Sequence, residues 1–460
     1  MKKLLLVMVL MVIGVIVYAE GTTFSWKGEF RTRTEMYKAP VVDGDISQFV
    51  DSRLRFYMNA KMSDSLSFTY GLEIGDLKWG ELGKGMPRDG INVETKHLYL
   101  DFKPDAMDSL AIRFGLLPVK DSFGGAMFDE DAVGLLITPK MENVKLTFGY
   151  VYLNDRMGNL NGASVSTTAT TQIKLIPVVN SAWSDLHYGM FDMNYTMSTS
   201  MNLMFGAYYM NGKATNLKII TPYVDTDEHL ELTKNTANAN SLWLAAGMSD
   251  KLSDTTTVGA QFIYLTEGIG RTDLLVESIE EDPTSNAVEA DLTYYPYHTF
   301  SYFAYAYGTY KASDKTNFKL NFGYIPGFDG QDMIAFHGID NKEYWSNFGL
   351  EYAFNGEVFD TNTGRLGYFA DGIMVISANA NLGMVYINAG YMSATASYLS
   401  DLDISKYLGL EFDLGMKYDI TKGLKLQAVG AIFLPGSYYE DKGNDTEIGY
   451  EFASCFKYAF

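Results

Sequence analysis

The sequence predicts an all-β protein, a transmembrane antiparallel up-and-down β-barrel. Three observations support this class: long strands alternate apolar and polar residues, short and long connections alternate along the chain, and the last strand ends in Phe460 with aromatic residues at alternate positions. We expect 18 strands, with 16 and 20 as alternatives, because single-chain bacterial barrels have even strand numbers.

The hairpin over residues 50–74 shows the pattern most clearly. On its first arm the apolar positions are Leu54, Phe56, Met58, Ala60 and Met62. A polar turn follows at residues 63–65, and the alternation then resumes. Side chains alternate between the two faces of a strand, and about 9–11 residues cross the hydrocarbon of a bilayer. A soluble β-sandwich can bury a similar face, so this hairpin alone leaves both classes open.

The chain begins with a predicted signal peptide at residues 1–19. Lys2 and Lys3 precede an apolar run of 14 residues, Leu4–Val17, and Ala19 follows. A spanning helix needs about 18 apolar residues, so we favour cleavage over a membrane anchor. Residues 20–460 then form one barrel domain, because neither a linker nor a change to helical patterning interrupts them.

The composition limits the partners. The formal charge is −20, which disfavours binding to nucleic acid and favours cations. Cys455 is the single cysteine, so the chain forms no intrachain disulfide. We expect contact with outer-membrane lipid, with ions and with small hydrophilic solutes.

The connections divide into two sets. The short ones are 63–65, 104–108, 140–143, 197–200, 250–254 and 421–423, and the long ones are 38–48, 80–91, 119–130, 156–180, 213–238, 268–285 and 436–445. In outer-membrane barrels the short turns face the periplasm and the long loops face outward. Residues 286–311 are too long for one strand, and residues 355–372 are either a long turn or contain a further strand.

The last strand is interpreted as an assembly signal. Phe456, Tyr458 and Phe460 share one face and end the chain, a pattern typical of outer-membrane barrels. An ordinary edge strand is the alternative. Together with the signal peptide, the pattern predicts localisation in the outer membrane.

The first 155 or so residues resemble bacterial outer-membrane porins of the alginate-export-like and related specific types, which have 16–18 strands. The segments that carry the resemblance are Gly28–Arg33, Arg53–Arg55, Leu72–Asp76 with Trp79 and Gly80, Arg113–Pro118 and Phe128–Gly134. The resemblance implies a passive pore and a homotrimer, and it names no solute.

Five arginines fall on the polar faces of their strands and are candidate pore-lining residues: Arg31, Arg33, Arg53, Arg55 and Arg113. They either form a ladder on the channel wall or pair with nearby carboxylates and only keep the wall polar. The third long loop, Val119–Glu130, and the start of the next strand supply the opposing candidates Asp121, Asp129, Glu130 and Asp131. If this loop folds inward, its carboxylates would face the arginines and filter solutes by charge.

Catalysis and metal binding have little support in the sequence. The five histidines are scattered, and no nucleophile elbow occurs. The acidic run 277–282 lacks the spacing of a calcium loop and is read as a solvated charge run. We therefore predict neither an enzyme, nor a cofactor, nor a metal site.

The leading functional prediction is a porin for passive diffusion of ions and small hydrophilic solutes, with a preference for cations. A substrate-specific channel for sugars or acidic oligosaccharides is the second reading. A structural or adhesive barrel is the third.

Overall fold

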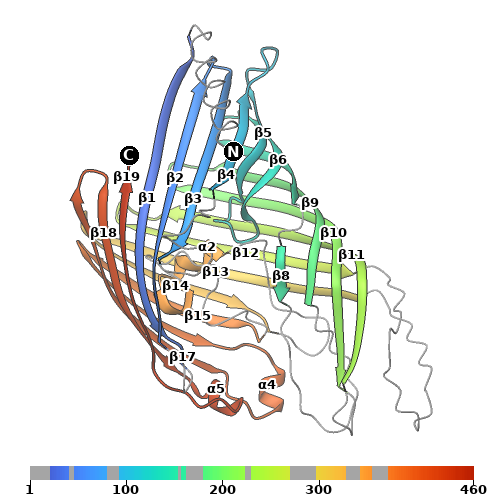
Figure 1. The fold of residues 1–460 in the computed structure, drawn as a ribbon, viewed down its shortest axis with the longest axis vertical. Coiled ribbons are helices and arrows are strands. Elements are labelled where there is room, and N and C mark those ends of the chain that lie inside the picture. Colours follow the sequence, from blue (N-terminus) through green and yellow to red (C-terminus); the bar gives the residue numbers. More distant parts are fainter. Residues whose placement is uncertain are drawn as a thin grey trace.

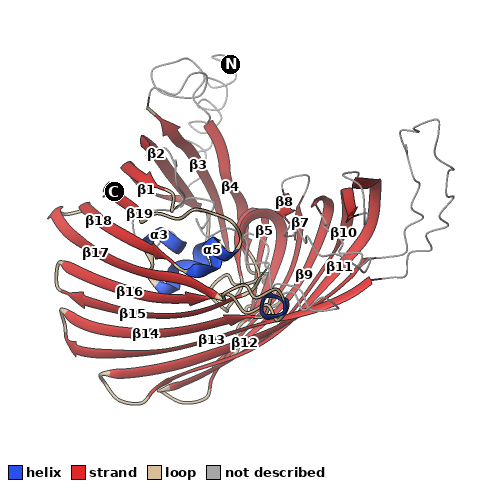
Figure 2. Ribbon diagram, turned by 90° about the horizontal axis from the view of Figure 1, so that it is seen from below, coloured by secondary structure: helices blue, strands red, loops and turns tan. Residues whose placement is uncertain are grey.

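The computed structural model describes residues 21–40, 46–79, 93–153, 157–161, 180–222, 229–269, 297–327, 342–354 and 371–460. Its strands form one sheet that curls into a barrel (Figures 1 and 2). The strands are β1 Thr23–Lys38, β2 Ile46–Lys61, β3 Leu66–Lys78, β4 Val93–Phe102, β5 Leu110–Lys120, β6 Asp129–Pro139, β7 Val144–Leu153, β8 Met157–Asn161, β9 Asn180–Thr196, β10 Met201–Pro222, β11 His229–Lys251, β12 Thr256–Ile269, β13 Tyr297–Ser313, β14 Thr316–Ile325, β15 Ile373–Leu382, β16 Val385–Ser393, β17 Tyr407–Thr421, β18 Leu424–Pro435 and β19 Gly449–Ala459.

The barrel closes because β1 pairs with β19 as well as with β2, both in antiparallel register. The sheet has 19 strands, but β7 and the short β8 pair with successive parts of β9 and so share one place in the wall. Eighteen places result, which confirms the predicted fold class and strand number. Closure leaves no free sheet edge around the ring, as a spanning sheet requires in lipid.

The alternation sorts the side chains as predicted. Large exposed apolar side chains project from the outer face; examples are Trp26, Phe30, Leu98, Phe114, Phe262, Leu320, Ile387 and Phe452. Such a band is what lipid contact requires. Within the described ranges, no helix is both long and apolar enough to cross a membrane.

Two predicted loops are partly strand. Most of the expected loop 213–238 belongs to β10 and β11, which have 22 and 23 residues. The expected loop 156–180 contains β8. Residues 286–296 and 355–370 lie outside the described residues, so the predictions for those two regions stay untested.

The barrel interior differs from the predicted open, polar lumen. Buried apolar side chains of β9–β18 form one cluster with the segment 342–354, which comprises α2 Lys342–Trp345, η1 Ser346–Phe348 and α3 Glu351–Phe354. Figure 2 shows α3 within the ring of strands. Two further short helices, α4 Tyr398–Asp401 and α5 Ser437–Asp441, belong to connections between strands. Part of the inner wall is therefore covered by protein.

Candidate functional site

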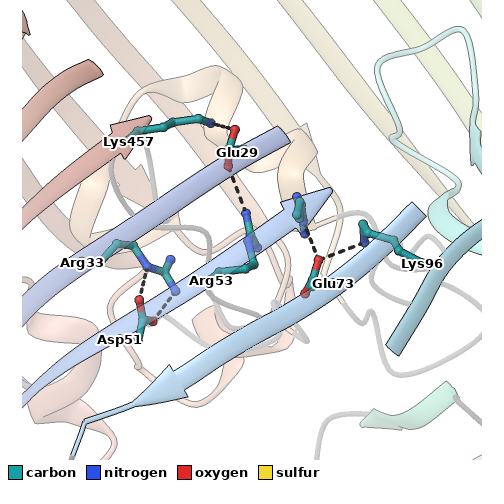
Figure 3. Close-up of polar contacts among 8 residues, drawn as sticks. Glu29, Arg33, Asp51, Arg53, Glu73, Lys96 and Lys457 are labelled. Carbon is teal, nitrogen blue, oxygen red and sulfur yellow. Dashed lines mark hydrogen bonds and ion pairs between the residues drawn. The ribbon is translucent and has the colours of Figure 1, made fainter. Parts of the chain in front are cut away.

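A network of ion pairs lines the inner wall of β1–β3 (Figure 3). Arg33 and Asp51 lie opposite each other on β1 and β2, and both side chains are buried. Arg33 donates from Nε to Oδ1 at 3.0 Å and from Nη2 to Oδ2 at 2.5 Å. The fork of a guanidinium fits a carboxylate in this way, so the pair is fixed in direction as well as in charge.

The network continues around the wall in both directions. Glu29 contacts Lys457 of β19 at 2.7 Å and Arg53 of β2 at 3.8 Å. Arg55 Nε donates to Glu73 of β3 at 2.5 Å. Arg31, which is also buried, stands opposite Arg53 in the ladder. Four of the five predicted arginines therefore lie together, and three of them have a carboxylate partner on the same wall.

Arg113 lies apart from this group. Its Nε donates to Asp101 of the neighbouring strand β4 at 2.7 Å, and its guanidinium lies 4.6 Å from the centre of the Tyr99 ring. Both Arg113 and Asp101 are close to the turn that joins β4 and β5. This arginine therefore belongs to the turn end of the barrel.

The third long loop folds into the barrel. Leu117, Val119, Phe123, Met127 and Phe128 are fully buried in the interior cluster. The Phe128 ring stacks on Tyr188 of β9 with 4.6 Å between centres. Burial of five large apolar side chains contributes on the order of 10 kcal/mol, at about 1.5–3 kcal/mol each. The hairpin tip is thus held firmly inside.

Asp121 organises this loop. Oδ1 accepts the backbone N–H groups of Phe123 at 2.8 Å and Gly125 at 2.9 Å, and Oδ2 accepts those of Met127 at 2.7 Å and Phe128 at 2.8 Å. Burial outweighs these bonds and raises the pKa of Asp121 to about 6. The carboxylate is directed into its own loop, so the structure gives it a different place from the predicted constriction charge.

The other predicted carboxylates lie on the same hairpin. Asp129 pairs with Lys120 across the two strands at 2.5 Å, and Glu130 follows it on β6. Asp131 receives Lys96 of β4 at 2.6 Å and contacts His97 Nε2 at 2.9 Å. Lys96 also lies 3.7 Å from Glu73. Asp131 is therefore joined to the arginine wall through Lys96.

A second inward element was not predicted from the sequence. Glu411 of β17 accepts the backbone N–H groups of Tyr352 at 2.7 Å and Ala353 at 2.9 Å, and Asp413 accepts that of Glu351 at 3.1 Å. These carboxylates hold the first turn of α3 against the wall. Their spacing, two residues apart on one strand face, is the signal that could have shown them.

Amides and aromatic rings complete this docking. Asn379 donates to the Phe348 carbonyl at 3.0 Å, and Asn388 donates to the Gly349 carbonyl at 2.5 Å. The Tyr344 hydroxyl donates to Gln261 at 2.9 Å, and burial raises the pKa of Tyr344 well above its ordinary value. The segment 342–354 is thereby attached to strands from β12 to β17.

The described residues contain no group of three or more His, Cys, Asp or Glu side chains that could hold a metal ion. The predicted assembly residues Phe456, Tyr458 and Phe460 lie exposed on the outer face. Tyr458 and Phe456 face Phe30 and Thr32 of β1 across the closing ladder.

No family model and no curated protein matches the sequence. Solved structures do match. OccK11 (OpdR) of Pseudomonas aeruginosa aligns with a TM-score of 0.51 at 10% identity, over 95% of this chain and 96% of that chain. OpdK, an outer membrane protein of the same organism, gives 0.48 at 9% identity over 95% and 98%. OmpT of Vibrio cholerae gives 0.42 at 11% identity over 96% and 98%. The first of these likenesses shows that the chain has the fold of outer-membrane porins.

Proposed function

We propose that this chain, which has the fold of an outer-membrane porin, forms an outer-membrane channel for passive diffusion of ions and small hydrophilic solutes. The observation that carries the proposal is the closed barrel with an apolar outer band and an inner wall of paired charges on β1–β3. The outer band suits lipid, and the paired wall suits water. Liposome swelling with sugars of graded size tests the channel. Swelling that falls with solute size supports it, and no swelling with the smallest sugar contradicts it.

We also propose a preference for cations. Three of the wall arginines are paired with carboxylates, which cancels much of their charge, so the net acidity of the chain remains to attract cations. The reversal potential across a planar bilayer in a salt gradient measures this preference. A reversal potential of the sign expected for anions would overturn it.

A substrate-specific channel is the second candidate, and the inward elements favour it. The hairpin tip 117–132 and the segment 342–354 both occupy the interior, which leaves a narrower passage than an empty 18-strand ring would. Saturation of sugar or oligosaccharide flux would support this candidate over simple diffusion. We retain the homotrimer as a proposal, and cross-linking in native membranes tests it.

A further inference from the structure

The main-chain ladder between β4 and β5 ends early. Pairing runs from Phe102 with Ile112 to Leu98 with Leu116, although both strands continue, β4 back to Val93 and β5 on to Lys120. On the other side of β4, the ladder with β3 extends as far as Val93. The wall between the described parts of β4 and β5 therefore lacks main-chain pairing along its loop-facing half.

The sequence explains why β5 leaves the wall. Gly115 has φ +132°, a conformation that favours glycine, and a Cβ there would overlap the Leu98 carbonyl. Pro118 has no N–H to donate to a ladder, and proline is confined to strand edges for that reason. The tip beyond this point is held inside by the buried face of Leu117, Val119 and Phe128. β5 cannot return to β4 without exposing that face.

This break lies within the apolar outer band. Val93 and Leu98 of β4 are exposed, as are Phe114 of β5 and Val133 of β6. Residue 93 pairs with Ile74, which continues the outward apolar row of β3. Lipid tails would thus meet the wall at a place where strands are not joined by backbone hydrogen bonds.

Side chains close the break instead. Asp131 on β6 reaches across to Lys96 at 2.6 Å and to His97 at 2.9 Å, and Lys96 also approaches Glu73. The Tyr57 and Tyr99 rings lie beside His97, with 5.2 and 5.9 Å between ring centres. The seal consists of two cationic or titratable groups around one carboxylate, and such partly exposed contacts are weak compared with a ladder.

We propose that this break is a lateral gate through which an amphipathic molecule with an acidic headgroup passes between the outer leaflet and the lumen. Its apolar body would lie between Leu98 and Pro118, and its acidic group would replace Asp131 on Lys96 and His97. The replacement exchanges one carboxylate for another, so the two cations keep a partner throughout. This route is separate from the axial passage of the proposed channel.

The first test follows a probe acid into the lumen. In a Cys455→Ser background, Tyr57→Cys carries a bimane label on the inner face, and the protein is placed in phospholipid vesicles. We expect 5-doxyl-stearate to quench this label saturably, and its methyl ester to quench far less, with the difference lost in Lys96→Met. Phe56→Cys, on the outer face of the same strand, is the matched control that both probes should quench. Equal, non-saturating quenching of the Tyr57 label by acid and ester would overturn the proposal.

The second test locks the gate. The pair Lys96→Cys/Asp131→Cys, added to the labelled variant, replaces the ionic contact by a reducible bond. We expect oxidation to abolish quenching by 5-doxyl-stearate and reduction to restore it. Swelling with arabinose reads the axial channel and should be the same in both states. Unchanged quenching after oxidation rejects the gate, whereas loss of swelling in every variant rejects only the proposed channel.

Discussion

Gly28 and Phe460 join the two ends of the barrel. The N–H of Gly28 donates to the Phe460 carbonyl at 2.9 Å, and the N–H of Phe460 donates to the Gly28 carbonyl at 3.0 Å. The Phe460 ring also covers Gly28, so that a Cβ at this position would overlap the ring. The last residue of the chain is thus paired on both its backbone and its side chain.

From this contact we predict that Gly28→Val impairs barrel closure. The added side chain must displace the Phe460 ring, and overpacking of this kind costs about 1–3 kcal/mol. The folded fraction is measured by the heat-dependent shift in gel mobility after refolding in detergent. Gly308→Ala, at a strand glycine with nothing within 4 Å of a Cβ, is the control. Equal folded fractions for the two variants would contradict the prediction.

Asp121→Asn should loosen the third loop. The amide offers one acceptor oxygen in place of two, so some of the four loop N–H groups lose their partner, at about 1–3 kcal/mol for each buried group. Hydrogen exchange of residues 121–128 measures the loss of protection. Asp129→Asn, whose partner Lys120 is half exposed, is expected to leave that protection nearly unchanged.

The same carboxyl should make the loop sensitive to pH. Its pKa is raised from 3.8 to about 6 by burial, so between these values the folded loop holds a proton that the unfolded loop has lost. The loop is accordingly most stable below about pH 4 and loses about 3 kcal/mol as the pH rises to 6. Exchange protection at pH 5 and pH 7.5, corrected for intrinsic rates, tests the sign. Protection that is greater at pH 7.5 would refute it.

Removal of Arg55 should shift ion selectivity towards cations. Arg55→Ala leaves the Glu73 carboxylate without its contact at 2.5 Å on the inner wall. The extra negative charge attracts cations, and the reversal potential should move in that direction. Lys61→Ala, which removes an exposed turn lysine beside Asp64, should produce a smaller change. If Arg53→Ala and Arg55→Ala both leave conductance and selectivity unchanged, these arginines do not shape the passage.

Glu411→Gln should release the segment 342–354 from the wall. The substitution leaves one oxygen for the two N–H groups of Tyr352 and Ala353, which costs about 1–3 kcal/mol. We expect more frequent openings of higher conductance in single-channel recordings. Asp419→Asn, at the exposed turn end of the same strand, is the control, and identical recordings for both would show that the segment does not obstruct flow.

The sequence predicted those parts of the molecule that lipid dictates. Because one face of each strand must be apolar, the alternation placed Arg33 and Asp51 on the inner wall and Phe456 on the outer face. It could not show the segment 342–354, because an element inside the barrel does not have to follow the period of a strand. Asp121 was misplaced for another reason: its partners are four backbone groups of its own loop, which no side-chain pattern records.

The length of β10 and β11 was missed because the outer parts of these strands need no apolar face. Strands of 22 and 23 residues are about twice what a bilayer requires. The distal half of this ribbon consequently stands well above the lipid surface. A short peptide tag inserted at its end should bind antibody on intact cells, which makes this hairpin a handle for following the protein without opening the envelope.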